Sequence, residues 1–244
     1  MEFKSRKLQP KKDNKNYYSK LNPEYPKWVD ECTWYAFGRE LEIGISESEM
    51  KKKCPTTNAE NWYKDSKFEK RVLPELGDIL VYSCGKRHHS SDGMGHVAVV
   101  EEVFEDNSIR ITESGHNMKF QTRKIKYPYK YYLKSQYKYT LDGFVHPQDY
   151  DNRYFKLGVY YKSKISKFIR LSVGVSNNKA KYNDLPKELK VLCNKVAGGY
   201  AKLKVGAKII PTEFKYDNKG YQWCKIFGYW ICNRDNTGYQ IIKV

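Results

Sequence analysis

Residues 95–113 have the sequence GHVAVVEEVFEDNSIRITE, and this stretch decides the fold predicted for the first half of the chain. The mostly apolar residues 95–103 predict one strand. Asp106-Asn107 predicts a two-residue turn, and residues 108–112 predict a strand that returns beside the first. The stretch therefore predicts a β-hairpin with His96 at the start of its first strand.

The register of this hairpin determines which side chains meet. A turn centred on Asp106-Asn107 pairs Val100 with Glu113 and His96 with Asn117, so that His96, Glu113 and Asn117 share one face. Either Glu113 or Asn117 could then orient the imidazole. A slip of one residue would send Glu113 to the opposite face.

Cys32 is the second residue of interest, and it begins the run Cys-Thr-Trp-Tyr-Ala. Residues 25–28 have the composition of a loop, whereas residues 33–41 have apolar side chains at helical spacing. Cys32 is therefore expected at a helix start, where backbone N–H groups and the helix dipole favour an anion. A thiolate needs such stabilisation, because a free thiol with a pKa of about 8.5 is mostly protonated at neutral pH.

These runs together resemble the CHAP family of cysteine, histidine-dependent amidohydrolases and peptidases, which cleave peptidoglycan. The resemblance covers about residues 17–147, including 76–80 (Leu-Gly-Asp-Ile-Leu) and 143–147 (Gly-Phe-Val-His-Pro). It implies a papain-like α+β domain, with N-terminal helices packed on an antiparallel sheet. It also implies a catalytic site in which Cys32 is the nucleophile, His96 the general base and Glu113 the group that orients His96.

Two positions depart from the family pattern. Members often have Gly-Gln directly before the cysteine, whereas this chain has Asp30-Glu31, so the backbone N–H of Cys32 is the remaining oxyanion donor. Members also commonly have Asn two residues after the Glu, and here that residue is Gly115. Asn117 is the candidate substitute, or the site works with Glu113 alone.

The last third of the chain predicts short strands and turns, including residues 201–210, 221–226 and 228–231. This spacing predicts a small all-β barrel, and the sequence resembles a bacterial SH3-like domain of the wall-binding type. The expected organisation is a catalytic domain at 1–147, a linker at 148–155 and a wall-binding domain at 156–244. Aromatic rings can grip sugars and peptides, and the candidate wall-binding residues are Tyr216, Tyr221, Trp223, Tyr229 and Trp230.

Charge and cysteine content limit the partners. The net charge of +17 favours polyanions such as teichoic acids, although simple lysine bias with solvated side chains also accounts for it. The six cysteines have no Cys-x-x-Cys pair, which predicts reduced thiols and no structural zinc. His88-His89 is interpreted as part of a solvated loop, and no metal or other cofactor is expected.

The leading hypothesis is a peptidoglycan hydrolase of the phage endolysin type, acting on Gram-positive walls as an endopeptidase or an N-acetylmuramoyl-L-alanine amidase. We expect no signal peptide and no membrane insertion, and therefore synthesis in a host cytoplasm with release to the wall. The alternative is a catalytically inactive wall-targeting protein. Nucleic-acid binding is not expected, because only the charge supports it and no recognisable motif is present.

Overall fold

The computed structural model describes residues 3–6, 16–21, 31–84, 94–115, 118–129, 131–132, 138–148, 155–174 and 178–244. The chain divides into two compact units. One contains Met1–Phe104 and Ser108–Arg153, and the other contains Glu105–Asn107 and Tyr154–Val244. The expected linker at 148–155 spans this division, and residues 149–154 lie outside the described part. Which function each unit has stays a prediction.

The first unit is built on a seven-stranded sheet with strand order β1-β7-β2-β3-β4-β5, in which β6 also pairs with β7. Its strands are β1 (Glu69–Arg71), β2 (Ile79–Cys84), β3 (His96–Val103), β4 (Ile109–Gly115), β5 (Met118–Ile125), β6 (Tyr131–Tyr132) and β7 (Lys138–His146). Its α-helices are α1 (Tyr18–Leu21), α2 (Cys32–Glu42), α3 (Glu47–Lys53) and α4 (Trp62–Asp65), with a 3₁₀ turn at Ala59–Asn61. Every pair of neighbouring strands is antiparallel, which confirms the α+β prediction.

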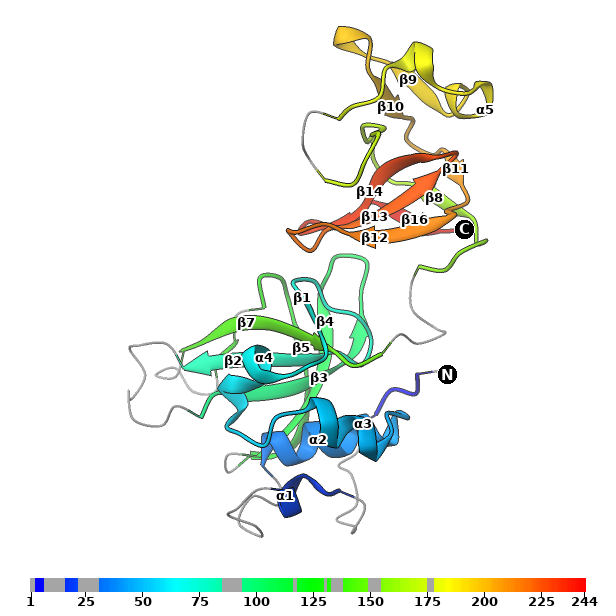
Figure 1. The fold of residues 1–244 in the computed structure, drawn as a ribbon. Helices are drawn as coiled ribbons and strands as arrows, with labels where there is room; N and C mark the ends of the chain where they lie inside the picture. Colours follow the sequence, from blue (N-terminus) through cyan, green and yellow to red (C-terminus); the bar gives the residue numbers. More distant parts are fainter. Residues whose placement is uncertain are drawn as a thin grey trace. The chain divides into compact units, whose positions relative to one another are not determined.

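Strand alternation places apolar side chains on both faces of this sheet. On β3, Val97 and Val99 belong to the core cluster that includes the α2 residues Tyr35 and Phe37. Val100, which points the other way, belongs to a second cluster on the opposite face. Helix α2 packs against β3 and β4, and Figure 1 shows α2 and α3 on one side of the sheet. This packing fixes the position of Cys32, the first residue of α2, relative to β3 and β4.

The hairpin between β3 and β4 differs from the expected one in its loop and register. The Phe104 amide donates to the Ser108 carbonyl at 2.9 Å, which closes a three-residue loop, and Asn107 has a φ of 62°. An irregularity between Val100 and Glu102 adds a second offset, so Val100 pairs with Ile111 rather than with Glu113. The predicted register was therefore wrong by two residues. Since side chains alternate with a period of two, this even shift keeps His96 and Glu113 on one face.

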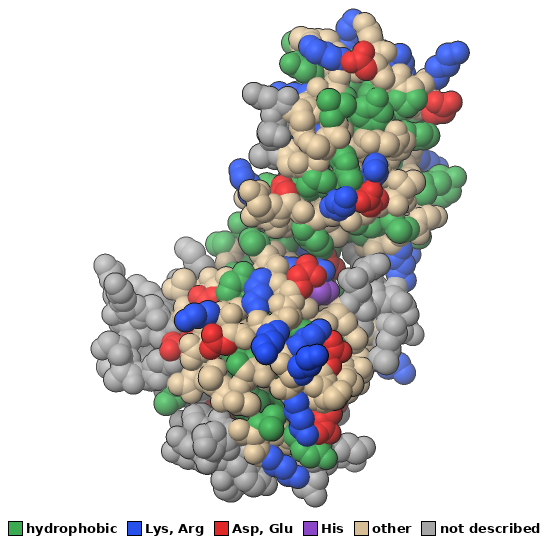
Figure 2. All heavy atoms as spheres, in the orientation of Figure 1, with side chains coloured by type: hydrophobic (Ala, Val, Ile, Leu, Met, Phe, Trp, Pro, Cys, Tyr) green, Lys and Arg blue, Asp and Glu red, His purple; other side chains and the backbone are tan. Residues whose placement is uncertain are grey.

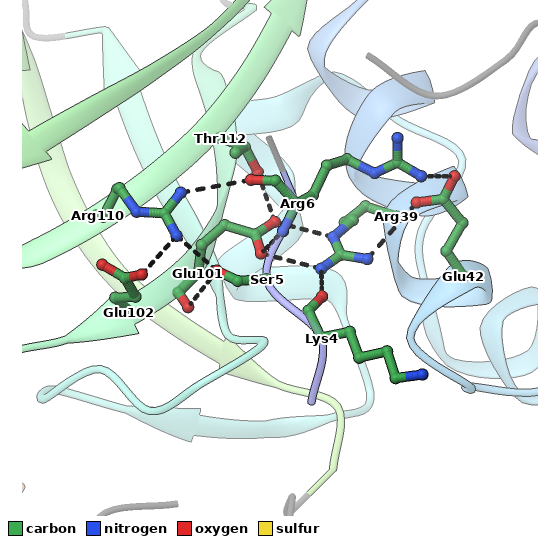
Figure 3. A network of polar contacts seen from close by, with 9 residues as sticks. All are labelled: Lys4, Ser5, Arg6, Arg39, Glu42, Glu101, Glu102, Arg110 and Thr112. Atoms are coloured by element: carbon green, nitrogen blue, oxygen red, sulfur yellow. Dashed lines mark hydrogen bonds and ion pairs between the residues drawn. The ribbon is translucent and has the colours of Figure 1, made fainter. Parts of the chain in front are cut away.

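A buried ion pair attaches α2 to this hairpin (Figure 3). Arg39 on α2 donates from Nε and Nη2 to the two carboxylate oxygens of Glu101, at 2.8 and 2.9 Å. Thr112 donates to the same carboxylate at 2.8 Å, and the backbone N–H of Arg6 donates at 2.8 Å. Arg39 also donates to the carbonyl of Lys4 at 2.5 Å. The segment 3–6, α2, β3 and β4 are thus joined through one carboxylate.

The second unit is rich in strands but differs from the expected all-β barrel. Its elements are β8 (Tyr161–Ser163), β9 (Cys193–Lys195), β10 (Ala201–Leu203), β11 (Lys208–Ile209), β12 (Glu213–Tyr216), β13 (Gln222–Ile226), β14 (Tyr229–Asp235), β15 (Gly238–Tyr239), β16 (Ile241–Lys243) and the helix α5 (Lys187–Lys190). The described strands form three sheets, β10-β9, β11-β8-β16 and β12-β13-β14-β15, and do not close into one barrel. Spacing along the sequence predicted strands and turns, but closure depends on which distant strands pair.

No helix among the described residues has both the length and the apolar character needed to cross a membrane.

Candidate active site

Cys32 is the first residue of α2, as the sequence predicted, and its side chain is buried. The preceding residue, Glu31, has an extended backbone conformation and does not cap the helix with its side chain. The positive end of the helix dipole therefore lies at the thiol.

His96 is the first residue of β3, and Glu113 lies on β4. His96 Nε2 and Glu113 Oε2 are 2.8 Å apart, and both side chains are almost completely buried. Gly95 precedes His96 with a φ of 64°, and a Cβ at this position would lie 2.4 Å from the Tyr82 carbonyl oxygen. A glycine is required there because the backbone turns tightly against β2 just before the histidine.

The surroundings of His96 favour its protonated form. Burial lowers its pKa, but the hydrogen bond and charge of Cys32, followed by those of Glu113, outweigh this effect and raise the pKa from its usual 6.5 to about 10. Cys32 thus contributes to the electrostatics of the imidazole, although the two residues are 64 positions apart in the sequence. A thiol, an imidazole and a carboxylate are in this way connected in sequence order Cys32, His96, Glu113.

Arg123 contacts the same carboxylate, although the sequence patterns did not indicate it as a site residue. Arg123 Nε donates to Glu113 Oε1 at 2.7 Å, and its Nη2 donates to Gln121 Oε1 at 3.2 Å. Strand β5 positions these side chains, because Gln121 pairs with Glu113 and Arg123 pairs with Ile111. The available signal was the two-residue spacing of Gln121 and Arg123 on a polar strand, which predicts a shared face. Glu113 therefore has one oxygen on His96 and the other on a guanidinium.

Gly115 explains one departure from the family pattern. It has a φ of 98°, and a Cβ on it would lie 2.3 Å from the backbone nitrogen of Cys32. No larger side chain fits here without moving the start of α2, so position 115 cannot supply an asparagine in this arrangement. Asn117, the other candidate for orienting His96, lies outside the described residues, and its role stays a prediction.

The five aromatic candidates of the second unit fall into two groups. Trp223 and Trp230 are buried and belong to a core cluster with Cys232. Their expected role as exposed wall-binding rings does not fit this burial, because their faces contact protein rather than solvent. Tyr216, Tyr221 and Tyr229 are partly exposed, and their role stays a prediction. Sequence alone could not separate these groups, since core and surface aromatics have the same strand pattern.

The remaining described thiols differ from Cys32 in their surroundings. Cys54, Cys193, Cys224 and Cys232 are free and buried. Burial raises the pKa of Cys193 to about 11 and that of Cys232 to about 12, and it also raises the pKa of Cys54 and Cys224. A high pKa keeps a thiol protonated and unreactive at neutral pH.

Among the described residues, no group of three or more His, Cys, Asp and Glu side chains could hold a metal ion. His88-His89 lies outside the described part. The expectation that no metal is needed stays a prediction.

Comparison with known protein families gives a match to part of the chain. Residues 20–115 match the family model of the CHAP domain, and this range contains Cys32, His96 and Glu113. The matched range lies in the first unit, apart from Glu105–Asn107, and covers less than half of the 244-residue chain.

One similar solved structure is described as an N-acetylmuramoyl-L-alanine amidase from Staphylococcus aureus. It is 25% identical to this chain, with a TM-score of 0.34, over 47% of this chain and 30% of that chain. The chain thus spans under a third of that protein, and a likeness at this TM-score carries no argument about the second unit or the activity. No curated protein matches the chain.

Proposed function

We propose that this protein is a peptidoglycan hydrolase that uses Cys32 as its nucleophile. The observation that carries the proposal is the connected set Cys32, His96 and Glu113, which lies inside the segment that matches the CHAP domain. A buried imidazole that stays protonated beside a cysteine is the partner a catalytic thiolate requires. The substrate is an amide bond in the stem peptide or cross-bridge of the wall.

The first chemical step forms an acyl-enzyme. The Cys32 thiolate attacks the carbonyl carbon and forms a carbon–sulfur bond, while the carbonyl oxygen takes up the negative charge. Protonated His96 then donates its proton to the leaving amine as the carbon–nitrogen bond breaks. The backbone N–H of Cys32, at the start of α2, is the proposed donor to the oxyanion.

Water completes the cycle. Neutral His96 accepts a proton from the water that attacks the thioester, and the carbon–sulfur bond breaks to release a carboxylic acid product. The sulfur leaves as a thiolate, so Cys32 and His96 return to their starting charges. Glu113 contacts Nε2, and we propose that this contact orients the ring and leaves Nδ1 for the sulfur and the reacting bond.

We further propose that the protein is an enzyme of the phage endolysin type and acts on Gram-positive walls. In this proposal the second unit is an SH3-like wall-binding domain. The resemblance of residues 201–231 to such domains supports this part, together with the basic character of the chain. Amidase and endopeptidase activity use the same catalytic groups. Mass spectrometry of the released fragments distinguishes them, because amidase action frees the amino terminus of the stem alanine and endopeptidase action frees one within the peptide.

The decisive experiment is Cys32→Ala in the full chain, assayed by the loss of turbidity of purified Gram-positive walls. We expect no lysis by this variant and undiminished sedimentation with the walls. Cys54→Ala is the matched control, because Cys54 is also a buried thiol of the first unit. Lysis by Cys32→Ala at the parent rate would contradict the assignment of the nucleophile.

A thiol-reactive probe separates the enzyme from the inactive wall-targeting alternative. At neutral pH we expect iodoacetamide to modify Cys32 before Cys54, Cys193, Cys224 and Cys232, whose pKa values burial raises. Peptide mapping after brief exposure identifies the modified residue. Equal and slow labelling of all these cysteines, with no lysis, would support the inactive protein.

A further inference from the structure

Three short segments of the second unit lie side by side and share one outward face. Residues 167–171, 178–181 and 200–203 are joined by backbone hydrogen bonds from Ile169 to Ala201, from Ala180 to Ile169 and from Ala201 to Ala180, at 3.0, 2.8 and 3.0 Å. These three residues are buried. Because side chains alternate along extended segments, their neighbours point outward.

Five of the flanking residues form what we call the lysine–aromatic face, namely Phe168, Lys179, Lys181, Tyr200 and Lys202. The sixth, Arg170, is half-buried and lies over the Trp223 ring. Antiparallel bridges pair Phe168 with Lys202 and Lys181 with Tyr200, so each ring has a lysine directly opposite. All five side chains are partly or fully exposed. The three segments therefore place three positive charges beside one another.

The rings hold these lysines by cation–π contacts. Lys179 Nζ and Lys202 Nζ each lie 4.4 Å from the centroid of Phe168. Lys181 Nζ lies 4.0 Å from the centroid of Tyr200 and Lys179 Nζ lies 5.5 Å from it. Such contacts fix an ammonium group without neutralising it. Because the rings already restrict these lysine side chains, the side chains lose less conformational entropy when a ligand binds.

No carboxylate of the described chain forms an ion pair with any of these three lysines. Lys181 donates to the Gly198 carbonyl at 2.7 Å, which positions the ammonium group but leaves its charge. Other lysines of this unit are compensated, as Lys167 is by Asp235 and Lys225 by Glu213. The three lysines of this face therefore keep their full charge, and the rings hold them beside one another.

Figure 2 shows Lys and Arg side chains spread over the visible face of each unit. The distribution of charge by itself thus does not identify a binding surface. The cation–π contacts between rings and lysines identify the lysine–aromatic face as the candidate. We propose that the lysine–aromatic face binds the phosphate groups of a wall-linked phosphodiester polymer. The choice of a wall polymer rests on the proposed function, whereas the affinity for closely spaced phosphates follows from the face itself.

The geometry favours a polymer without bases over nucleic acid. Proteins that bind single strands use exposed ring faces on which bases stack. Here ammonium groups lie over Phe168 and Tyr200 at 4.0 to 4.4 Å, so these rings have partners on the faces that a base would use. The face therefore presents lysine ammonium groups, which bind phosphate.

The test compares two triple variants in the full chain carrying Cys32→Ala, so that the walls stay intact. One is Lys179→Gln/Lys181→Gln/Lys202→Gln, and its matched control is Lys162→Gln/Lys187→Gln/Lys219→Gln, whose residues lie on β8, on α5 and between β12 and β13. The control removes the same charge from exposed lysines of the same unit. Sedimentation with purified Gram-positive walls is measured before and after hydrofluoric acid extraction, which removes phosphodiester-linked polymers.

We expect the face variant to bind untreated walls about tenfold more weakly than its parent, and to show a shallower salt dependence because fewer counterions are released. The control should bind within about twofold of the parent, since scattered surface charges contribute little. Extraction of the walls should reduce parent binding to the level of the face variant. Lys179→Arg/Lys181→Arg/Lys202→Arg should bind like the parent, which excludes a folding defect as the cause.

Three results would overturn the proposal: equal losses in the face variant and the control, undiminished parent binding to extracted walls, or tighter binding of single-stranded DNA than of wall polymer through the same lysines. The last result would assign the face to nucleic acid. Hydrolysis is assayed separately with Cys32 intact. A parent chain that binds walls through this face but cleaves none would contradict the hydrolase proposal and leave the binding result standing.

Discussion

The candidate active site and the lysine–aromatic face use charge in opposite ways. At the active site, His96 and Glu113 are almost completely buried, and Glu113 is bonded to both His96 and Arg123. On the lysine–aromatic face, Lys179, Lys181 and Lys202 are held by rings and have no described carboxylate partner. Buried charges interact strongly and must be paired, whereas exposed charges are weakly coupled and stay available for a ligand.

The largest expected effect comes from breaking a buried pair. Arg39→Met leaves the Glu101 carboxylate buried without its guanidinium, and we expect the free energy of unfolding to fall by about 3–5 kcal/mol. Urea unfolding of the full chain, followed by tryptophan fluorescence, measures this loss. Lys51→Met is the control, because the Lys51–Glu47 pair is more than a third exposed and contributes at most about 0.5 kcal/mol. Equal losses in the two variants would contradict the contrast between buried and exposed charge.

The second prediction concerns the protonation of His96. Since the folded pKa is raised, the stabilising contribution of the imidazolium is present below pH 6.5 and is lost as the pH rises through about 10. Hydrolysis needs this proton for the leaving amine, so we expect the rate on wall fragments to fall through the same alkaline range.

Glu113→Gln tests this dependence. It removes the negative charge that helps raise the pKa of His96 and leaves a weaker, neutral hydrogen bond, so the alkaline decline should move to lower pH, and the maximal rate should fall by roughly 10²-fold. A pH profile of fragment release from pH 6 to about 11 measures both changes. An unchanged profile in the variant would show that Glu113 does not act on His96.

The smallest of these effects is expected for Arg123, which contacts the Glu113 carboxylate and is expected to act on the imidazole through it. We expect Arg123→Gln to lower kcat by about tenfold with little change in KM, because Glu113 loses its second anchor and holds His96 less well. Arg123→Lys should restore part of the rate, since it keeps a cation near Glu113. A change in KM alone would instead place Arg123 in substrate binding.

Local sequence patterns predicted the elements that carry the chemistry. The helix start at Cys32 and the strand start at His96 were both confirmed. These predictions succeed because a helical or strand pattern depends on residues close together in the chain. The register of the hairpin was wrong because the left-handed conformation of Asn107 and the irregularity beside Glu101 each add one residue. Such features depend on what the strand packs against.

The sequence by itself determined which residues could be nucleophile, base and orienting acid, and where alternating strands occur in both units. Only the tertiary structure showed that Arg123 shares Glu113 with His96, that Gly115 lies against the start of α2, and that Trp223 and Trp230 are core residues. It also brought together the lysine–aromatic face from three separate segments. The physical reason is that these contacts join residues far apart in the chain, and their distances are set by strand register, bulges and burial rather than by any local pattern.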